Sequence, residues 1–209
     1  VEIRSKLEQN FNLLATESSS DTSILLLHGR GLHPSEPNII DPLRVDLINV
    51  GYNVFSLQLP VLEKGKSYNE YVKIFKYSDT RIESALNYID SKKIIIIAHS
   101  CGAHMLLSFI DNMGIGNISG IVLLGAGAVD KGQAMKTDIN LSNYKIPVLN
   151  IYAEYDHNSV KQFADVLKLQ YSISQDKYLN ALEVNSADHN YKDQTYTLIE
   201  SVKKWLKAL

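Results

Sequence analysis

Six short aliphatic runs, separated by longer stretches with helical spacing, constrain the fold of this chain most strongly. Each run consists mainly of β-branched and aliphatic residues without polar alternation, which is typical of strands covered on both faces. The runs are Ser23–Leu27, Asn53–Leu57, Ile94–Ala98, Gly120–Leu124, Val148–Ala153 and Leu179–Val184. Helices are expected at roughly 39–50, 68–90, 103–113, 160–169 and 191–209. This alternation predicts a doubly wound α/β fold, a mostly parallel sheet with helices on both faces.

The chain is expected to form one domain over residues 1–209, since its length and its 45% apolar content suit a single packed core. Residues 1–21 are interpreted as an extension or an edge strand, with Phe11–Thr16 as the candidate strand. Residues 125–147 are interpreted as a short loop or lid insertion. No linker or repeat divides the sequence.

Charge and composition exclude several classes of function. The net charge of −2, without a dense basic run, gives no support for binding to nucleic acid or to an anionic membrane. The single cysteine, Cys101, excludes an intrachain disulfide and a cysteine-rich metal site. No apolar run approaches the roughly 20 residues of a membrane span. We therefore expect neither a membrane segment nor a signal peptide in this chain, and leave the compartment (cytoplasmic or exported with a leader removed) and the oligomeric state open.

The segment Ala98-His99-Ser100-Cys101-Gly102 stands directly after an all-aliphatic strand and directly before a predicted helix. A serine on such a sharp turn projects its Oγ out of the sheet, and small residues two positions to either side let strand and helix pass closely. This context indicates a nucleophile elbow with alanine in place of the first glycine. The alternative is an ordinary turn in which Ser100 caps the helix.

A second motif, His28-Gly29-Arg30-Gly31, ends the first strong strand. Acyl transfer develops negative charge on a carbonyl oxygen, which needs backbone N–H groups aimed at it. We expect these N–H groups from Cys101 and Arg30, because glycines on both sides of Arg30 let the backbone turn inward. His28 is interpreted as a brace for this loop rather than a catalytic group. His28, Gly29, Gly31 and His99 are the candidates for contacts with substrate, and a purely structural glycine-rich turn is the alternative.

The two motifs together resemble the α/β-hydrolase superfamily, particularly its small esterases and thioesterases, and the resemblance extends from Ser23 to the end of the chain. It implies an acid after the next-to-last strand and a histidine after the last. Asp156 and His189 occupy these positions, with Glu154 as the alternative acid. His189 would accept the proton of Ser100 and return it to the leaving group, while Asp156 would hold the tautomer of the imidazole.

The remaining reactive side chains receive structural interpretations. Cys101 is a rival nucleophile, but Gly102 lies two positions after Ser100, whereas Ala103 lies two after Cys101, so the register favours serine. Asp188 is expected to shape the loop beside His189. Three further histidines are interpreted as loop or helix-face residues: His33, His104 and His157. No set of residues has metal-ligand spacing, and neither a metal nor a cofactor is expected.

The gap at Gly125–Pro147 is too short for a substantial cap domain. We therefore expect an open cleft, edged by the loops at Leu59–Ser67 and Val129–Lys145, that takes modest acyl and alcohol groups. Arg30 could attract a carboxylate or phosphate of the substrate, or could make a salt bridge that braces its loop.

These features predict a serine hydrolase that cleaves a small-molecule carboxylic ester or thioester through an acyl-enzyme on Ser100. Two alternatives stay open. The chain could be a catalytically inactive binding protein of the same fold, or an acyltransferase or lyase that uses the same triad.

Overall fold

The computed structural model describes residues 1–7, 10–136, 139–175 and 177–209, and within them the strands form one eight-stranded sheet. The spatial order of the strands is β1-β2-β4-β3-β5-β6-β7-β8. The strands are β1 (Glu2–Arg4), β2 (Asn10–Thr16), β3 (Thr22–Leu27), β4 (Asn53–Leu57), β5 (Lys93–His99), β6 (Ile118–Leu124), β7 (Val148–Ala153) and β8 (Leu179–Val184). All six aliphatic runs of the sequence lie within strands of this sheet.

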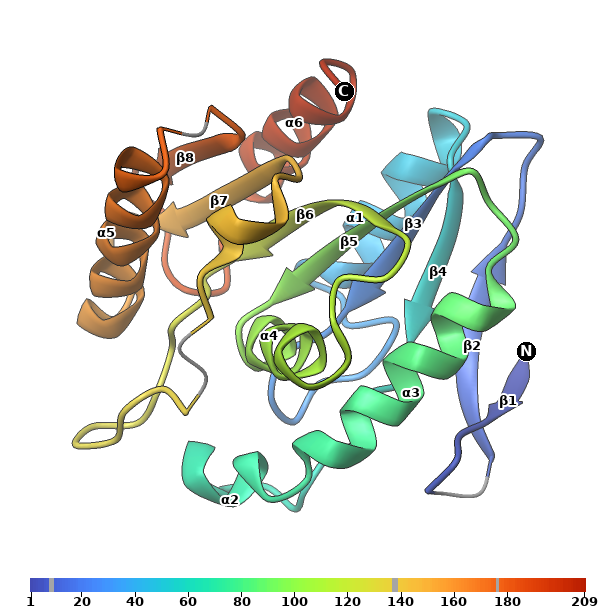
Figure 1. Ribbon diagram of the computed structural model, residues 1–209, viewed down its shortest axis with the longest axis horizontal. Coiled ribbons are helices and arrows are strands. Elements are labelled where there is room, and N and C mark those ends of the chain that lie inside the picture. Colours follow the sequence, from blue (N-terminus) through green and yellow to red (C-terminus); the bar gives the residue numbers. More distant parts are fainter. Residues whose placement is uncertain (8–9, 137–138, 176) are drawn as a thin grey trace.

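The sheet is parallel from β4 to β8 and antiparallel only at its N-terminal side (Figure 1). There β2 pairs antiparallel with β4, and β1 pairs antiparallel with β2. The candidate edge strand of the sequence analysis thus corresponds to β2, but β1 occupies the edge itself. β1 has three residues, which is too short for a periodic pattern to mark it.

Helices cover both faces of the sheet (Figure 1). They are α1 (Ile40–Asn49), α2 (Tyr68–Val72), α3 (Phe75–Tyr88), α4 (Cys101–Met113), α5 (Asn158–Ile173), α6 (Thr195–Leu206) and a short 3₁₀ turn (Leu141–Tyr144). The side chains of β5 alternate between the two cores, as the pleat of a strand requires. Ile94 and Ile96 pack with α3, α4 and α5, whereas Ile95 and Ile97 pack with α1 and α6. The sheet is therefore buried on both faces at its centre.

Two predicted helices have different bounds in the structure. The stretch 68–90 forms α2 and α3, separated by Lys73 and Ile74, rather than one helix. The C-terminal helix begins at Thr195 rather than at Tyr191, because Tyr191 and Asp193 have φ angles of 52° and 59°. Such left-handed residues interrupt a right-handed helix.

The expectation that every aliphatic run is covered on both faces is wrong for β8. Four of its six residues are exposed, because β8 is the last strand of the sheet and, among the described residues, pairs with β7 alone. Asn180 and Glu183 within this strand are consistent with an edge, where polar side chains limit pairing with other chains.

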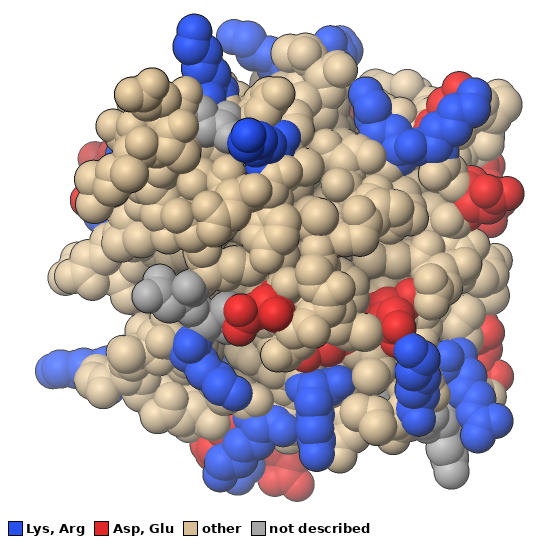
Figure 2. All heavy atoms as spheres, in the orientation of Figure 1, with Lys and Arg blue, Asp and Glu red and all other residues tan. Residues whose placement is uncertain are grey.

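Charged side chains on the face seen in Figure 2 lie mainly toward its upper and lower margins, with acidic and basic groups mixed. Within the described residues, no helix is both long and apolar enough to cross a membrane.

Candidate active site

Ser100 lies at the turn between β5 and α4, with a backbone conformation that few residues other than glycine adopt. Its φ and ψ angles are 51° and −118°. The Ser100 N–H donates a hydrogen bond of 2.8 Å to the carbonyl of Leu124, at the end of the neighbouring strand β6. Backbone strain of this kind persists only where surrounding contacts enforce it, and it often accompanies function. The turn has the form expected of a nucleophile elbow.

Gly102 allows the turn because the end of β3 passes directly beside it. A Cβ atom at this position would lie 2.5 Å from the carbonyl oxygen of His28 and 2.8 Å from that of Leu27. Both neighbours are backbone atoms, so no side chain could move away to make room. The glycine of the sequence motif is therefore required by the close approach of β3 and α4.

Ser100, His189 and Asp156 form a continuous hydrogen-bonded chain. The Nε2 atom of His189 is 2.8 Å from Oγ of Ser100, and its Nδ1 atom is 2.6 Å from Oδ1 of Asp156. A carboxylate can only accept, so Nδ1 carries the proton and Nε2 is free to accept the hydroxyl proton of Ser100. The structure thus brings together the three residues named as a candidate triad.

Asp156 lies in the turn after β7 with its side chain fully buried. Its carboxylate also accepts hydrogen bonds from the backbone N–H groups of His157 at 2.8 Å and Ala153 at 3.5 Å. Burial alone would raise the pKa of Asp156. The hydrogen bond and the electrostatic attraction of His189, together with the two backbone donors, hold that pKa below its ordinary value. The group is therefore ionised at neutral pH.

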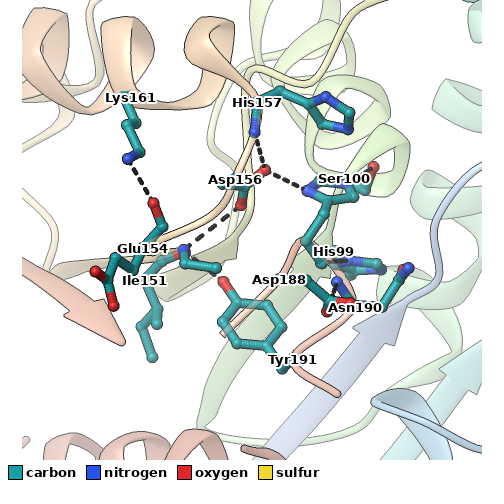
Figure 3. A network of polar contacts seen from close by, with 12 residues as sticks. His99, Ser100, Ile151, Glu154, Asp156, His157, Lys161, Asp188, Asn190 and Tyr191 are labelled. Carbon is teal, nitrogen blue, oxygen red and sulfur yellow. Dashed lines mark hydrogen bonds and ion pairs between the residues drawn. The ribbon is translucent and has the colours of Figure 1, made fainter. Parts of the chain in front are cut away.

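Glu154, the alternative acid, is engaged elsewhere. Its Oε2 atom accepts a hydrogen bond of 2.7 Å from the N–H of Ser186, and its backbone carbonyl accepts one from the ammonium of Lys161. Figure 3 shows the Glu154 carboxylate pointing away from Asp156 and Ser100. Glu154 thus joins the turns that follow β7 and β8.

The loop that carries His189 is held in an unusual but well-connected conformation. Ser186, Tyr191 and Asp193 all have positive φ angles, and the buried Tyr191 hydroxyl donates to the carbonyl of Ile151 at 2.9 Å (Figure 3). Asp188 accepts hydrogen bonds from the N–H groups of Asn190 and Lys192, at 2.9 and 3.1 Å, consistent with its expected role in shaping the loop. These contacts fix the position of the imidazole before any substrate arrives.

Gly125, at the end of β6, is a site residue that the sequence analysis did not single out. A Cβ atom there would lie 2.9 Å from Cε1 of His189 and 3.3 Å from Oδ2 of Asp156, and its φ angle is 56°. Only glycine leaves room for the paired imidazole and carboxylate. The available signal was its position, directly after a strand predicted to end beside the elbow strand.

The oxyanion-hole candidates are the backbone N–H groups of Arg30 and Cys101, which border the same cavity as Ser100. Within the described parts of the chain, neither N–H donates to another group, so both are free to bind an oxyanion. The carbonyl of Gly29 accepts hydrogen bonds from Nδ1 of His28 at 2.9 Å and from the N–H of Leu32 at 3.2 Å. Since the peptide is planar, fixing this carbonyl also fixes the opposed N–H of Arg30.

His28 acts as a brace and does not face the cavity. It is buried, and its Nε2 atom accepts a hydrogen bond of 3.1 Å from the N–H of Leu59, which places the ring proton on Nδ1. Burial lowers the pKa of His28 to about 4, so the ring is neutral at physiological pH. Both ring nitrogens are occupied within the protein, and the candidate contact of His28 with substrate does not fit this position.

The cavity over Ser100 has a volume of about 420 Å³. It is lined by Gly29, Arg30, Leu32, Tyr68, His99, Ser100, Cys101, Ala128–Lys131, His157, His189 and Asn190. The expected edges of the cleft are correct only in part. Residues 128–131 do line it, but the loop at 59–67 contributes to a neighbouring cavity that also contains Gly31. The remainder of the second expected loop includes Thr137 and Asp138, which lie outside the described residues.

Two side chains beside the nucleophile are neutral by virtue of burial. His99 contacts the backbone carbonyl of His189 through Nε2 at 3.2 Å, and burial lowers the pKa of His99 to about 4. Burial raises the pKa of the Cys101 thiol to about 12. A thiol that stays protonated is a poor nucleophile, which agrees with the register argument for Ser100.

The other histidines have different surroundings. His104 is fully buried on α4, where its ring lies 4.9 Å from that of Tyr68. His157 is exposed, with its ring 5.0 Å from that of His189, and His33 is exposed in the β3–α1 loop.

The sequence analysis gave the Arg30 side chain two interpretations, attraction of a substrate anion or a salt bridge within the protein. The structure shows the salt bridge. Its guanidinium binds Asp130 through two hydrogen bonds, of 2.6 and 2.9 Å. The carboxylate of Asp130 therefore already balances the charge of the Arg30 guanidinium at the border of the cavity.

One group of potential metal ligands exists within the described residues, although the sequence spacing indicated none. Asp156, His157 and His189 offer ligand atoms that lie within 4.8 Å of one another. Two of these side chains are joined by the 2.6 Å hydrogen bond between Nδ1 and Oδ1. A cation would have to displace that proton, so the donor set fits a triad better than a metal centre.

Comparisons with known proteins agree with this architecture. No family model matches the sequence, and no curated protein matches it. Among solved structures, an esterase from Exiguobacterium antarcticum superimposes with a TM-score of 0.74 and 12% identity, covering 99% of this chain and 98% of its own. An esterase from Pyrococcus furiosus gives 0.75 and 16%, covering 100% and 89%. The protein Est1E from Butyrivibrio proteoclasticus, solved with ferulic acid bound, gives 0.71 and 15%, covering 95% of each chain.

Proposed function

From an α/β-hydrolase fold and a hydrogen-bonded Ser100–His189–Asp156 chain, we propose that this protein is a serine hydrolase of carboxylic esters or thioesters. The observation that carries the proposal is the pair of contacts made by His189, 2.8 Å to the hydroxyl of Ser100 and 2.6 Å to Asp156. A nucleophile, a base and a group that orients the base are the minimum set for acyl transfer by serine. Two of the structural neighbours are named as esterases, which supports the same reaction class.

The first half of the reaction forms an acyl-enzyme. Oγ of Ser100 attacks the carbonyl carbon of the substrate as its proton passes to Nε2 of His189. Negative charge develops on the carbonyl oxygen, which the N–H groups of Arg30 and Cys101 would bind. The tetrahedral intermediate then expels the alcohol or thiol, which takes the proton from His189. Asp156 stabilises the imidazolium throughout these steps.

The second half releases the acid. Water attacks the acyl-enzyme and gives its proton to Nε2 of His189, and the same N–H groups bind the second oxyanion. When this intermediate collapses, the acid leaves and Ser100 recovers its proton from His189. No group besides the chain itself and water is needed for either half.

The cavity supports substrates of modest size. Its volume of about 420 Å³ lies at the smaller end of ordinary small-molecule sites, and it is bordered by the polar side chains of His157, Lys131 and Asn190. The neighbour from Butyrivibrio proteoclasticus was solved with ferulic acid bound, which is an aromatic carboxylic acid. Esters of short aliphatic or aromatic acids are therefore the first substrates to try.

The experiment is turnover of p-nitrophenyl esters and acyl-thioesters of increasing chain length. Wild-type protein should hydrolyse the short members, and Ser100→Ala should lose this activity. Ser108→Ala is the matched control, since Ser108 lies on α4, the helix that follows Ser100, and contacts Asp79 at 3.3 Å, away from the cavity. A wild-type protein inactive on the whole panel, or an active Ser100→Ala, would refute the proposal. Product analysis with added alcohol would reveal acyl transfer instead of hydrolysis.

A further inference from the structure

Asp130 connects three segments that lie far apart in the sequence. Its two carboxylate oxygens accept hydrogen bonds from both terminal nitrogens of Arg30, at 2.6 and 2.9 Å, across a sequence separation of 100 residues. The oxygen that makes the shorter bond also accepts one of 2.6 Å from the backbone N–H of Tyr68, the first residue of α2. Asp130 itself belongs to the segment between β6 and β7. One carboxylate thus ties this segment to α2 and to the loop after β3.

Arg30 needs such an anchor because of its neighbours in the chain. It stands between two glycines, and Gly31 has a φ angle of 70°, so the backbone there has little intrinsic preference. On the N-terminal side, the Gly29 carbonyl is held by His28 at 2.9 Å. The N–H of Leu32 donates to this same carbonyl at 3.2 Å, so both backbone restraints act on the peptide that precedes Arg30. The side chain of Arg30 therefore adds a restraint from a different direction, through its bonds to Asp130.

From this geometry we infer that Asp130 is a positioning residue for catalysis, which holds the N–H of Arg30 where the oxyanion forms. A bidentate guanidinium–carboxylate contact fixes both distance and orientation, which a single hydrogen bond does not. Asp130 acts through Arg30 and does not need to contact the reacting atoms. The inference rests on the proposed function, since it assigns Asp130 to the oxyanion site of that same reaction.

The surroundings of the pair are consistent with this role. The side chains of Arg30 and Asp130 are 36% and 35% exposed, so the contact stands partly in water and contributes little to stability. Hydrogen bonds from Arg30 hold the pKa of Asp130 below its ordinary value, with burial opposing them and the N–H of Tyr68 reinforcing them. Asp130 is therefore ionised at neutral pH, as a partner of the guanidinium must be.

The test compares Asp130→Asn with two matched controls. Asn keeps the size of the side chain but removes the charge and the bidentate acceptor. Gln133→Ala removes a second link between the same segment and α2, the bond of 2.9 Å from the N–H of Asn69, without touching Arg30. Asp41→Ala removes another partly exposed contact with an arginine, Arg44, on α1.

For each variant, kcat, KM, the melting temperature and the affinity for a boronic acid that forms a tetrahedral adduct with serine should be measured. We expect Asp130→Asn to lower kcat about tenfold with KM within about twofold, because removing an oxyanion donor outright costs about 10²–10³ and a misplaced one should cost less. Boronate affinity should fall in parallel, and Asp130→Glu should recover part of the loss. Both controls should retain wild-type kcat.

Several outcomes would overturn the inference. An unchanged kcat in Asp130→Asn would do so, as would an equal loss in Gln133→Ala, which would indicate anchoring of the segment instead. A loss of activity that merely follows the melting temperature would also count against it. All of these outcomes require an active wild-type enzyme, so they differ from failure of the proposed function, in which wild type itself hydrolyses nothing.

Discussion

The Nε2 atom of His189 lies 2.8 Å from the Oγ atom of Ser100, although 89 positions separate the two residues in the chain. They meet because parallel strands bring their carboxyl ends to one edge of the sheet. Ser100 follows β5, Asp156 follows β7 and His189 follows β8, so three separate turns converge on one point. The predictions below follow from the contacts at that edge.

Asp156→Asn should abolish most of the activity while leaving the fold intact. An amide in place of the carboxylate can present an N–H to Nδ1 of His189, which favours the wrong tautomer, and comparable substitutions cost about 10⁴-fold in kcat. The matched variant Glu154→Gln keeps its bond to Ser186 through an amide oxygen and should retain wild-type kcat. Steady-state kinetics on one ester decides between them, and the reverse order of the two losses would make Glu154 the acid.

Gly125→Ala should lower kcat about 100-fold, because the new methyl group would press on His189 and displacements near 1 Å can cost that much. The control is Gly132→Ala, whose φ angle of 79° imposes similar backbone strain but which has no atom within 4 Å of the new Cβ. Thermal melting should show at least as large a loss of stability in Gly125→Ala as in Gly132→Ala, since the first also meets His189, but only Gly125→Ala should lose activity. Equal kcat values would remove Gly125 from the site.

Gly102→Ala should destabilise the whole protein and not only its active site. Its Cβ atom would meet two backbone carbonyl oxygens at 2.5 and 2.8 Å, so β3 and α4 would have to separate. Overpacking of this kind costs about 1–3 kcal/mol or more. The measurement is the free energy of unfolding in urea, with Gly114→Ala at the end of α4 as a control that has positive φ and open space. A variant as stable as that control would contradict the structure.

Acidification should destabilise the protein through three buried histidines. Burial lowers the pKa values of His28, His99 and His104 to about 4 from an ordinary value of 6.5. Between those values the unfolded chain binds more protons than the native one, so the free energy of unfolding falls as the pH drops from about 6.5 toward 4. Urea titrations across this window measure the slope. The slope measures how many protons the chain takes up on unfolding, and His104→Gln should lower that number by about one. An unchanged slope would mean that His104 is not held neutral.

The centre of the fold could be predicted because its strands are buried on both faces, which leaves an unmistakable aliphatic run such as Ile94–Ala98. The position of the outermost strands at the two edges of the sheet could not be predicted in this way. β8 has an aliphatic run too, but its exposure depends on the absence of a further strand beyond it, which no local pattern records. β1 is too short to have a period, and the break between α2 and α3 at Lys73 and Ile74 carries neither glycine nor proline.

The candidate site followed the same division. Ser100 was a candidate because its turn follows a buried strand, and Asp156 and His189 were candidates because the resemblance implies an acid and a histidine after the last two strands. Gly125 escaped notice although it also follows a strand, because its requirement arises from the volume of an imidazole that arrives from another loop. Asp130 offered no signal at all, since nothing in a polar loop indicates an arginine partner 100 residues away. Contacts between loops are set by tertiary packing, which the sequence pattern does not reveal.

The most direct test of the proposed serine hydrolase is covalent labelling by a fluorophosphonate, read by intact-protein mass spectrometry and peptide mapping. Folded wild-type protein should gain one adduct, on Ser100. Cys101→Ala should label equally, because the buried thiol takes no part, and Ser100→Ala should not label. Folded wild type that gains no adduct, or an adduct that maps to Cys101, would contradict the assignment of Ser100 as the nucleophile.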